Sequence, residues 1–177
     1  MEYLQHPKEL GINFLNSVRA NHALEHATLH ILEEKGLKAA LSGLSDAGGF
    51  WVAGNVTAEM LLRSAHEALI RLQGGDVRLA VHENCGTNLA TTGAIVGGLA
   101  WLSMLGTRKG LTRKVERLPL VILMATIGLV IAKPLGPILQ EKFTTLVGGH
   151  RLEILGLHSY TIGPWTVLRV STHAFEG

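Results

Sequence analysis

The chain has 177 residues, a length typical of one domain with its own hydrophobic core. Charged residues make up only 17% of it and the mean hydropathy is +0.27, so part of the chain is expected to avoid water. The net charge of +2 does not indicate nucleic-acid binding, because the basic excess lies in one short segment and residues 1–85 are net acidic. The single cysteine excludes an internal disulfide and leaves the redox compartment open.

The first predicted element is a helix over residues 14–35. Pro7 suits a first helical turn, and Gly36 follows as a C-terminal cap. Apolar residues spread around much of the circumference of this helix, which predicts that it is well buried.

Short strands and a second helix follow. Residues 37–44 and 49–56 have strand length, with a turn signal between them at 45–48. Thr57 is a predicted N-cap for a helix over 58–73 that ends at a Gly-Gly pair. Residues 77–82 alternate between apolar and polar side chains, which predicts a third strand.

Two segments without charged residues come next, 86–105 and 118–132. Their lengths are close to the ~20 residues that cross a bilayer as a helix, which favours a transmembrane hairpin. Small residues recur four apart in both segments, and this spacing lets membrane helices approach closely: Gly93 and Gly97, Gly128 and Ala132. The alternative is a pair of buried helices in a soluble core.

The connector 107–117 is strongly basic. It holds five cations against one acid: Arg108, Lys109, Arg113, Lys114 and Arg117, with Glu116. The positive-inside rule places such a loop in the cytoplasm, or against anionic headgroups. That orientation would export residues 1–85, although the N-terminus shows no signal-peptide pattern. The side of the membrane therefore stays open.

Residues 151–160 and 165–172 are predicted to be two further strands. The expected fold is α+β: a small helix-and-sheet domain, interrupted by the membrane hairpin and completed by the C-terminal tail. The expected organisation is an N-terminal α+β segment at 1–85, the hairpin at 86–140, and a β segment at 141–177 that packs on the N-terminal part.

Metal-competent side chains concentrate in the first helix, in the segment His22-Ala-Leu-Glu-His26 and at His30. Two histidines four apart project from one helix face and can share a zinc ion, or another divalent transition metal. Glu25 is the predicted catalytic general base, which would activate a metal-bound water. Further ligands are left open among His30, His66 or Glu67 on the second helix, and His82 or Cys85. The alternative is that these histidines form hydrogen bonds in a buried seam or face solvent.

The segment His82-Glu-Asn-Cys-Gly-Thr-Asn88 precedes the first membrane helix. Turn formation and helix capping by Asn84, Thr87 or Asn88 explain its glycine and polar residues. They do not explain a histidine and a thiol, both of which ligate soft metals, so a shared metal site at His82 and Cys85 is a second interpretation. Cysteine catalysis is a third interpretation, but the sequence shows nothing that would lower the pKa of the thiol.

Two resemblances rest on these motifs. The segments Arg19-x-Asn21-His-Ala-Leu-Glu-His-Ala-Thr28, Gly49-Phe50 and His82-x-Asn84-Cys-Gly-Thr-Asn88 resemble an uncharacterised bacterial two-span membrane family, a domain of unknown function. That resemblance implies membrane residence without an established activity. His22-Ala-Leu-Glu-His26 is similar to the zinc motif of pitrilysin-type metallopeptidases, the inverzincins. This similarity implies His22 and His26 as zinc ligands and Glu25 as general base, with a downstream glutamate, of which Glu67 is the nearest, as third ligand.

The sequence therefore supports two functions. One is a membrane-anchored metal-binding protein. Its enzymatic form would be a metal-dependent, peptidase-like hydrolase. The other is a non-catalytic membrane subunit for assembly or partner docking. Expected partners are the lipid bilayer and proteins, or a second copy through the hairpin, but not nucleic acid. The expected location is the plasma membrane of a bacterium. A transporter is disfavoured, because two spans form no pathway alone.

Overall fold

The computed structural model describes residues 7–37, 40–107, 110–148, 150–162 and 165–176. The chain divides into two compact units. The first combines Met1–His82 with Glu141–Gly177, and we call it the α+β unit; the second is Glu83–Gln140, the hairpin unit. Each unit is described by itself.

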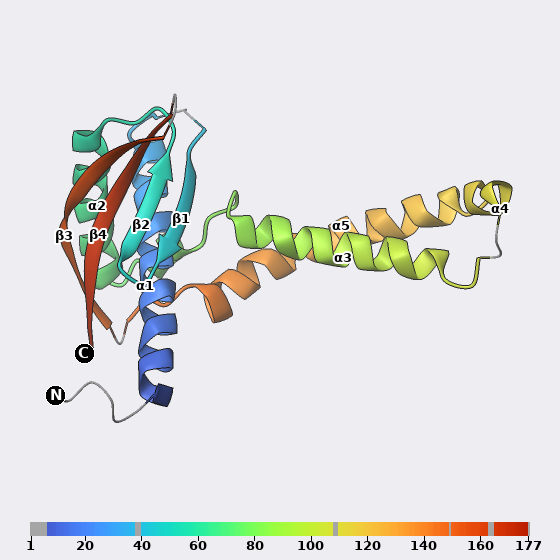
Figure 1. The fold of residues 1–177 in the computed structure, drawn as a ribbon, viewed down its shortest axis with the longest axis horizontal. Helices are drawn as coiled ribbons and strands as arrows, with labels where there is room; N and C mark the ends of the chain where they lie inside the picture. Colours follow the sequence, from blue (N-terminus) through green and yellow to red (C-terminus); the bar gives the residue numbers. More distant parts are fainter. Residues whose placement is uncertain (1–6, 38–39, 108–109, 149, 163–164, 177) are drawn as a thin grey trace. The chain divides into compact units, whose positions relative to one another are not determined.

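One antiparallel sheet organises the α+β unit (Figure 1). Its strands are β1 (Ser42–Asp46), β2 (Gly49–Ala53), β3 (His150–Ile162) and β4 (Trp165–Glu176), in the spatial order β1-β2-β4-β3. The C-terminal strand β4 pairs directly with β2 near the N-terminus. The predicted α+β class and the completion of the sheet by the C-terminal tail are therefore confirmed.

Two helices, α1 (Pro7–Glu34) and α2 (Ala58–Gln73), pack on one face of this sheet. Alternate residues of the central strands point into the core, as the period of two requires. The completely buried side chains include Phe50, Val52 and Val170 from the strands and Leu24 and Leu61 from the helices. Most side chains in the middle of α1 are buried, as the apolar pattern around this helix predicts.

The second helix has the predicted bounds and the predicted cap, since the Thr57 side chain accepts a hydrogen bond from the Met60 amide. The first strand, β1, differs from the segment predicted at 37–44, of which residues 38–39 lie outside the described residues. Ser45 and Asp46, predicted in a turn, pair with Phe50 and Gly49. The connection is thus a tight hairpin, and β1 begins and ends later than its composition indicates.

The predicted strand over residues 77–82 is wrong. Val77–Ala80 forms a short 3₁₀ helix, η1. Its carbonyl groups do not join the sheet, because the Ala80 oxygen accepts from His26 and the next one, on Val81, accepts from His30. Short alternating segments fit either assignment, and the contacts with α1 decide it here.

The hairpin unit contains α3 (Gly86–Met104), α4 (Leu111–Val115) and α5 (Leu118–Leu139), followed by a π-helical turn, η2 (Gln140–Thr144). α3 and α5 lie side by side (Figure 1). A short helix, α4, occupies part of the predicted connector, of which Arg108 and Lys109 lie outside the described residues.

Small residues bring these helices together at one of the two predicted places. A Cβ atom on Gly128 of α5 would lie 3.0 Å from the Val96 Cα on α3, so a side chain at residue 128 would push the two helix backbones apart. Gly93 and Gly97 of α3 have no described atom within 4 Å of such a Cβ position. The predicted use of Gly93 and Gly97 in packing α3 on α5 is therefore wrong.

Within the described residues, one helical segment is long and apolar enough to cross a membrane, Leu111–Thr144. The first predicted span, now α3, does not reach that hydropathy. Its polar residues near the N-terminus and Ser103 near the C-terminus explain the difference. Length and composition therefore mark one candidate span rather than two.

Candidate metal centre

Four histidines follow one another along α1 and the segment after η1. His22, His26 and His30 lie on successive turns of α1, as the spacing of four predicts. The ring centroids of His22 and His26 are 4.2 Å apart, those of His26 and His82 are 5.8 Å apart, and those of His30 and His82 are 4.8 Å apart. The structure thus brings His82 to the predicted histidine face of α1.

Backbone carbonyl groups fix the tautomers of the three helix histidines. Nδ1 of His22 lies 2.9 Å from the Thr144 oxygen, and Nδ1 of His26 lies 2.7 Å from the Ala80 oxygen. In His30 the other nitrogen, Nε2, lies 2.8 Å from the Val81 oxygen. A carbonyl oxygen only accepts, so each of these nitrogens carries the proton. In the neutral ring the opposite nitrogen then carries a lone pair.

The nitrogen that bears the lone pair in His26 is Nε2, and it is buried. The His26 side chain is 1% exposed, and Nε2 has no hydrogen-bond partner among the described residues. Leaving such a polar atom unsatisfied costs about 1–3 kcal/mol, so a native structure usually has a reason for it. A ring N–H held by a carbonyl, with the other nitrogen available, is the arrangement of a metal-ligating histidine.

Three residues of the α+β unit form a potential metal site. One ligand atom each of His30, Glu33 and His82 lies within 4.8 Å of the other two. His82 Nε2 is 3.3 Å from Glu33 Oε1, and His30 Nδ1 is 4.0 Å from Glu33 Oε2. Sequence reasoning missed Glu33, although its spacing of three from His30 puts both on one helix face.

Burial sets the charge of His82. Desolvation is the largest cause that lowers the pKa of His82 below its usual 6.5, and the neighbouring His30 lowers it further. The Glu33 carboxylate opposes both effects. The His82 imidazole is therefore neutral at pH 7, which is the form that binds metals.

The predicted general base, Glu25, has a different environment. Its buried carboxylate accepts a hydrogen bond from the Ser45 hydroxyl on β1. A Cβ atom on Gly43 would overlap this carboxylate, so a side chain at residue 43 would require the Glu25 carboxylate to move. Glu25 is not in the His30–Glu33–His82 group, and its catalytic role stays a prediction.

The other predicted ligands have structural partners or lie elsewhere. Glu67 on α2 forms an ion pair with Lys35 at 2.8 Å, and His66 is exposed on the same helix. Cys85 belongs to the hairpin unit, where its thiol group is the N-cap of α3 and accepts from the Thr87 amide. Capping at this position is confirmed, but Cys85 performs it rather than Asn84, Thr87 or Asn88.

Two asparagines of the sequence motifs have structural contacts. Asn21 donates to the Asp46 carbonyl oxygen and accepts from the Thr172 hydroxyl, which ties α1 to β1 and β4. Asn88 of the hairpin unit donates to the Glu83 carbonyl oxygen and accepts from Gln140. These contacts explain the asparagines without a ligand.

The chain matches a protein family and a curated relative. A family model described as a domain of unknown function, DUF6391, matches residues 17–157. An uncharacterized protein of Picosynechococcus sp. (strain PCC 7002) is 37% identical over 105 residues, which cover 52% of this chain and 51% of that protein. The chain thus spans about half the length of this curated relative. No solved structure matches the chain.

Proposed function

This chain belongs to the DUF6391 family, and we propose that it is a membrane-anchored protein that binds a divalent transition metal on the histidine face of α1. The ligands are His30, Glu33 and His82, and zinc is the first metal to test. One observation carries the proposal. Ligand atoms of His30, Glu33 and His82 lie within 4.8 Å of one another, and the backbone carbonyl group of Val81 orients the His30 ring, as hydrogen-bond acceptors orient metal-ligating histidines.

The chemistry of the donors fits zinc. Two imidazoles and one carboxylate are a donor set that zinc accepts, and this set leaves a fourth position open. The His30 side chain is 28% exposed and that of Glu33 is 54% exposed, so an ion can reach them from solvent. Closing the group around an ion requires movement of the Glu33 side chain, which exposure permits.

Membrane anchoring rests on the surface of the hairpin unit. Large apolar side chains of α5 are exposed, and contact of such a surface with water is unfavourable: Ile122 is 64% exposed, Leu123 55% and Val130 69%. We propose that α5 spans the bilayer and that α3, about 28 Å long at 1.5 Å per residue, spans it beside α5. The bilayer is that of the bacterial plasma membrane.

Metal analysis of the purified full-length protein tests the metal site. The wild type is expected to retain stoichiometric zinc after dialysis, and Co²⁺ in its place should give the visible absorption of a site with mixed nitrogen and oxygen ligands. His82→Ala and Glu33→Gln should each weaken the affinity roughly tenfold or more. His66→Ala on the exposed side of α2 is the matched control.

His30→Ala guards against loss of folding, because its side chain is only partly buried. Unchanged zinc affinity in a folded His30→Ala protein, or no zinc in the wild type, would reject the metal site. In that event the non-catalytic assembly function, with the histidines as hydrogen-bonding groups, is the better explanation.

Hydrolysis is a second candidate, favoured by the donor set alone. A divalent metal bound there would supply Lewis acidity, and His30 and His82 would hold it. The Glu25 carboxylate of α1 is held by its hydrogen bond from Ser45 of β1. The zinc-loaded protein should then cleave a fluorogenic peptide in detergent, and His82→Ala should abolish cleavage. Equal rates in both proteins would reject hydrolysis and leave metal binding intact.

Bromine-labelled lipids test the second span. Trp101 on α3 is 65% exposed, so in a protein with Trp51→Phe and Trp165→Phe it reports the surroundings of that helix. Lipids brominated on the acyl chain should quench its fluorescence in nanodiscs. Quenching by aqueous iodide in place of brominated lipid would show that α3 lies outside the bilayer.

A further inference from the structure

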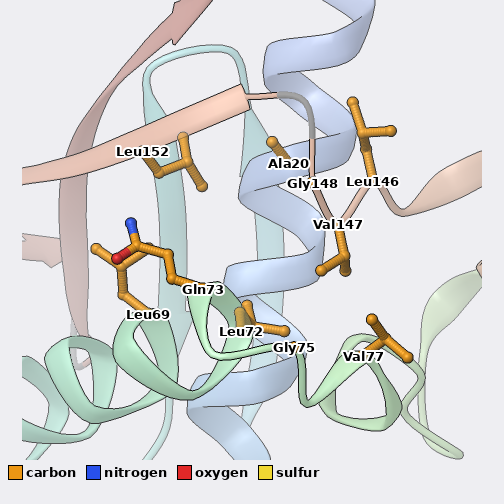
Figure 2. A pocket seen from close by; sticks show the side chains of 10 residues that line it. All are labelled: Ala20, Leu69, Leu72, Gln73, Gly75, Val77, Leu146, Val147, Gly148 and Leu152. Atoms are coloured by element: carbon orange, nitrogen blue, oxygen red, sulfur yellow. The ribbon is translucent and has the colours of Figure 1, made fainter. Parts of the chain in front are cut away.

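A cavity of about 610 Å³ lies in the α+β unit between α1, α2 and the segment before β3 (Figure 2). We infer that it binds a neutral, mainly apolar small molecule with one hydrogen-bonding group, of the long-chain alcohol class. This goes beyond the proposed metal site, because none of the metal ligands lines the cavity.

The walls of the cavity select for an apolar ligand. Figure 2 shows Leu69 and Leu72 on α2, Leu152 on β3, and Leu146 and Val147 on the segment between η2 and β3. Pockets for small molecules have volumes of roughly 300–1,000 Å³ and mainly apolar linings, so both size and composition fit.

The polar features of the cavity exclude a charged ligand. None of the described residues that line the cavity is charged, and a carboxylate or ammonium group would lose its hydration without a partner among them. Among these described lining residues, Gln73 alone has a polar side chain, and it is exposed. Its amide both donates and accepts, which suits a hydroxyl or carbonyl group at one end of a ligand.

Hydrogen bonds hold the wall opposite α2 in place, so the cavity exists before any ligand arrives. The Leu146 amide donates to the Arg19 carbonyl oxygen at 3.1 Å, and the Arg19 guanidinium donates to the carbonyl oxygens of Lys142 and Thr145. The segment that carries Leu146 and Val147 is thereby attached to α1. A preformed cavity avoids the entropic cost of ordering its walls on binding.

A small molecule fits this cavity better than a protein partner does. A stable protein interface buries about 800 Å² on each side, whereas this hollow is bounded on several sides by separate segments. Membrane anchoring, as proposed above, would give the protein access to apolar molecules dissolved in lipid, and this part of the inference rests on that proposal.

Photolabelling of the full-length protein in nanodiscs tests the inference. The probe is hexadecanol that carries a diazirine, and labelled residues are mapped by mass spectrometry of peptides. We expect label in residues 69–77 and 146–152, with displacement by unlabelled hexadecanol. A diazirine-labelled hexadecanoate should label these residues roughly tenfold less, because none of the described lining residues is a cation.

Variants connect the label to the cavity. Val77→Trp fills the space from an exposed position and should lower the labelling roughly tenfold. Ile70→Trp is the matched control, because Ile70 is exposed on α2 but does not line the cavity. Gln73→Leu should remove the preference for the alcohol over a diazirine-labelled hexadecane.

Three results would overturn the inference. They are label confined to residues 86–139, equal labelling by alcohol and carboxylate, and equal labelling of the Val77→Trp and Ile70→Trp proteins. Zinc content is measured on the same samples. Absence of zinc together with normal labelling would reject the proposed metal site and leave this inference intact. Bound zinc together with no labelling would do the reverse.

Discussion

The carboxylate of Asp46, at the end of β1, accepts hydrogen bonds from three different residues. It accepts two from the Arg169 guanidinium on β4, one from the Gly48 amide at 2.8 Å, and one from the Trp51 indole at 3.0 Å. The guanidinium also lies 4.5 Å from the centroid of the Trp51 ring. These contacts connect β1, β2 and β4 on the face of the sheet away from α1.

The hydrogen bonds from Arg169 are the largest cause that lowers the pKa of Asp46 from 3.8 to about 2, while burial opposes them. The folded state thus binds a proton more weakly than the unfolded state. The contribution of Asp46 to stability is complete above the unfolded pKa and is lost as the pH falls through the folded pKa.

We therefore expect Asp46→Asn to be less stable than the wild type by about 1 kcal/mol at pH 7, with a difference that shrinks between pH 4 and pH 2. The value is below the full linkage energy because the Asp46 side chain is 45% exposed and partly screened. Urea unfolding of both proteins across this pH range measures it. Glu59→Gln, in an exposed pair with Arg63, should show little pH dependence; an equal response there would contradict the assignment.

Sequence reasoning at single residues worked where one helix determines the geometry. His22, His26 and His30 share a face of α1 because their spacing is four, and Glu33 follows the same rule. It could not place Glu25, since Ser45 and Gly43 approach it from a strand. That approach depends on tertiary packing, which spacing along one helix does not contain.

The same distinction holds for whole elements. α2 was predictable because a cap, an amphipathic pattern and a terminal Gly-Gly pair agree on its ends. Residues 77–80 were not, since alternation over so few residues fits a strand and a 3₁₀ helix equally. His26 and His30 select the second by binding the carbonyl groups of Ala80 and Val81.

The packing of α3 on α5 gives a prediction at this scale. Gly128→Leu should destabilise the hairpin by about 1–3 kcal/mol, because its Cβ would meet the backbone of Val96. Gly93→Leu is the matched control, since its Cβ position has no described neighbour within 4 Å. SDS titration of the purified proteins, followed by tryptophan fluorescence, compares them. A larger loss of stability in Gly93→Leu would instead support packing of α3 on α5 through Gly93, as the small-residue spacing predicts.

At the scale of the whole chain, the sheet joins residues far apart in the sequence. β4 lies between β2 and β3, so residues after the hairpin unit supply a central strand to a core that begins in α1. The sequence indicated the segments of these four strands, although it also predicted a strand at 77–82 that is a 3₁₀ helix, and the order of the strands depends on pairing that no local pattern encodes. Asn21 and Thr172 show the same dependence with a single hydrogen bond of 2.6 Å.

A charge at the centre of β4 should therefore unfold elements at the other end of the chain. Val170 is completely buried and pairs with Phe50 of β2 and Leu157 of β3. Val170→Asp would bury an unpaired carboxylate at a cost of about 3–5 kcal/mol, a large part of the stability of a domain. We expect rapid proteolysis within α1 and loss of zinc from His30 and His82, although both residues are far from β4 along the chain.

Thr166→Asp places the same charge at an exposed position of the same strand and should leave both measurements unchanged. Limited proteolysis with mass mapping, on full-length protein in nanodiscs, compares the two variants. If Val170→Asp accelerated cleavage only after residue 140, α1 and α2 would fold without the C-terminal strands. The histidine face would then depend on α1 and the segment at 77–82 alone, and zinc binding would survive the substitution.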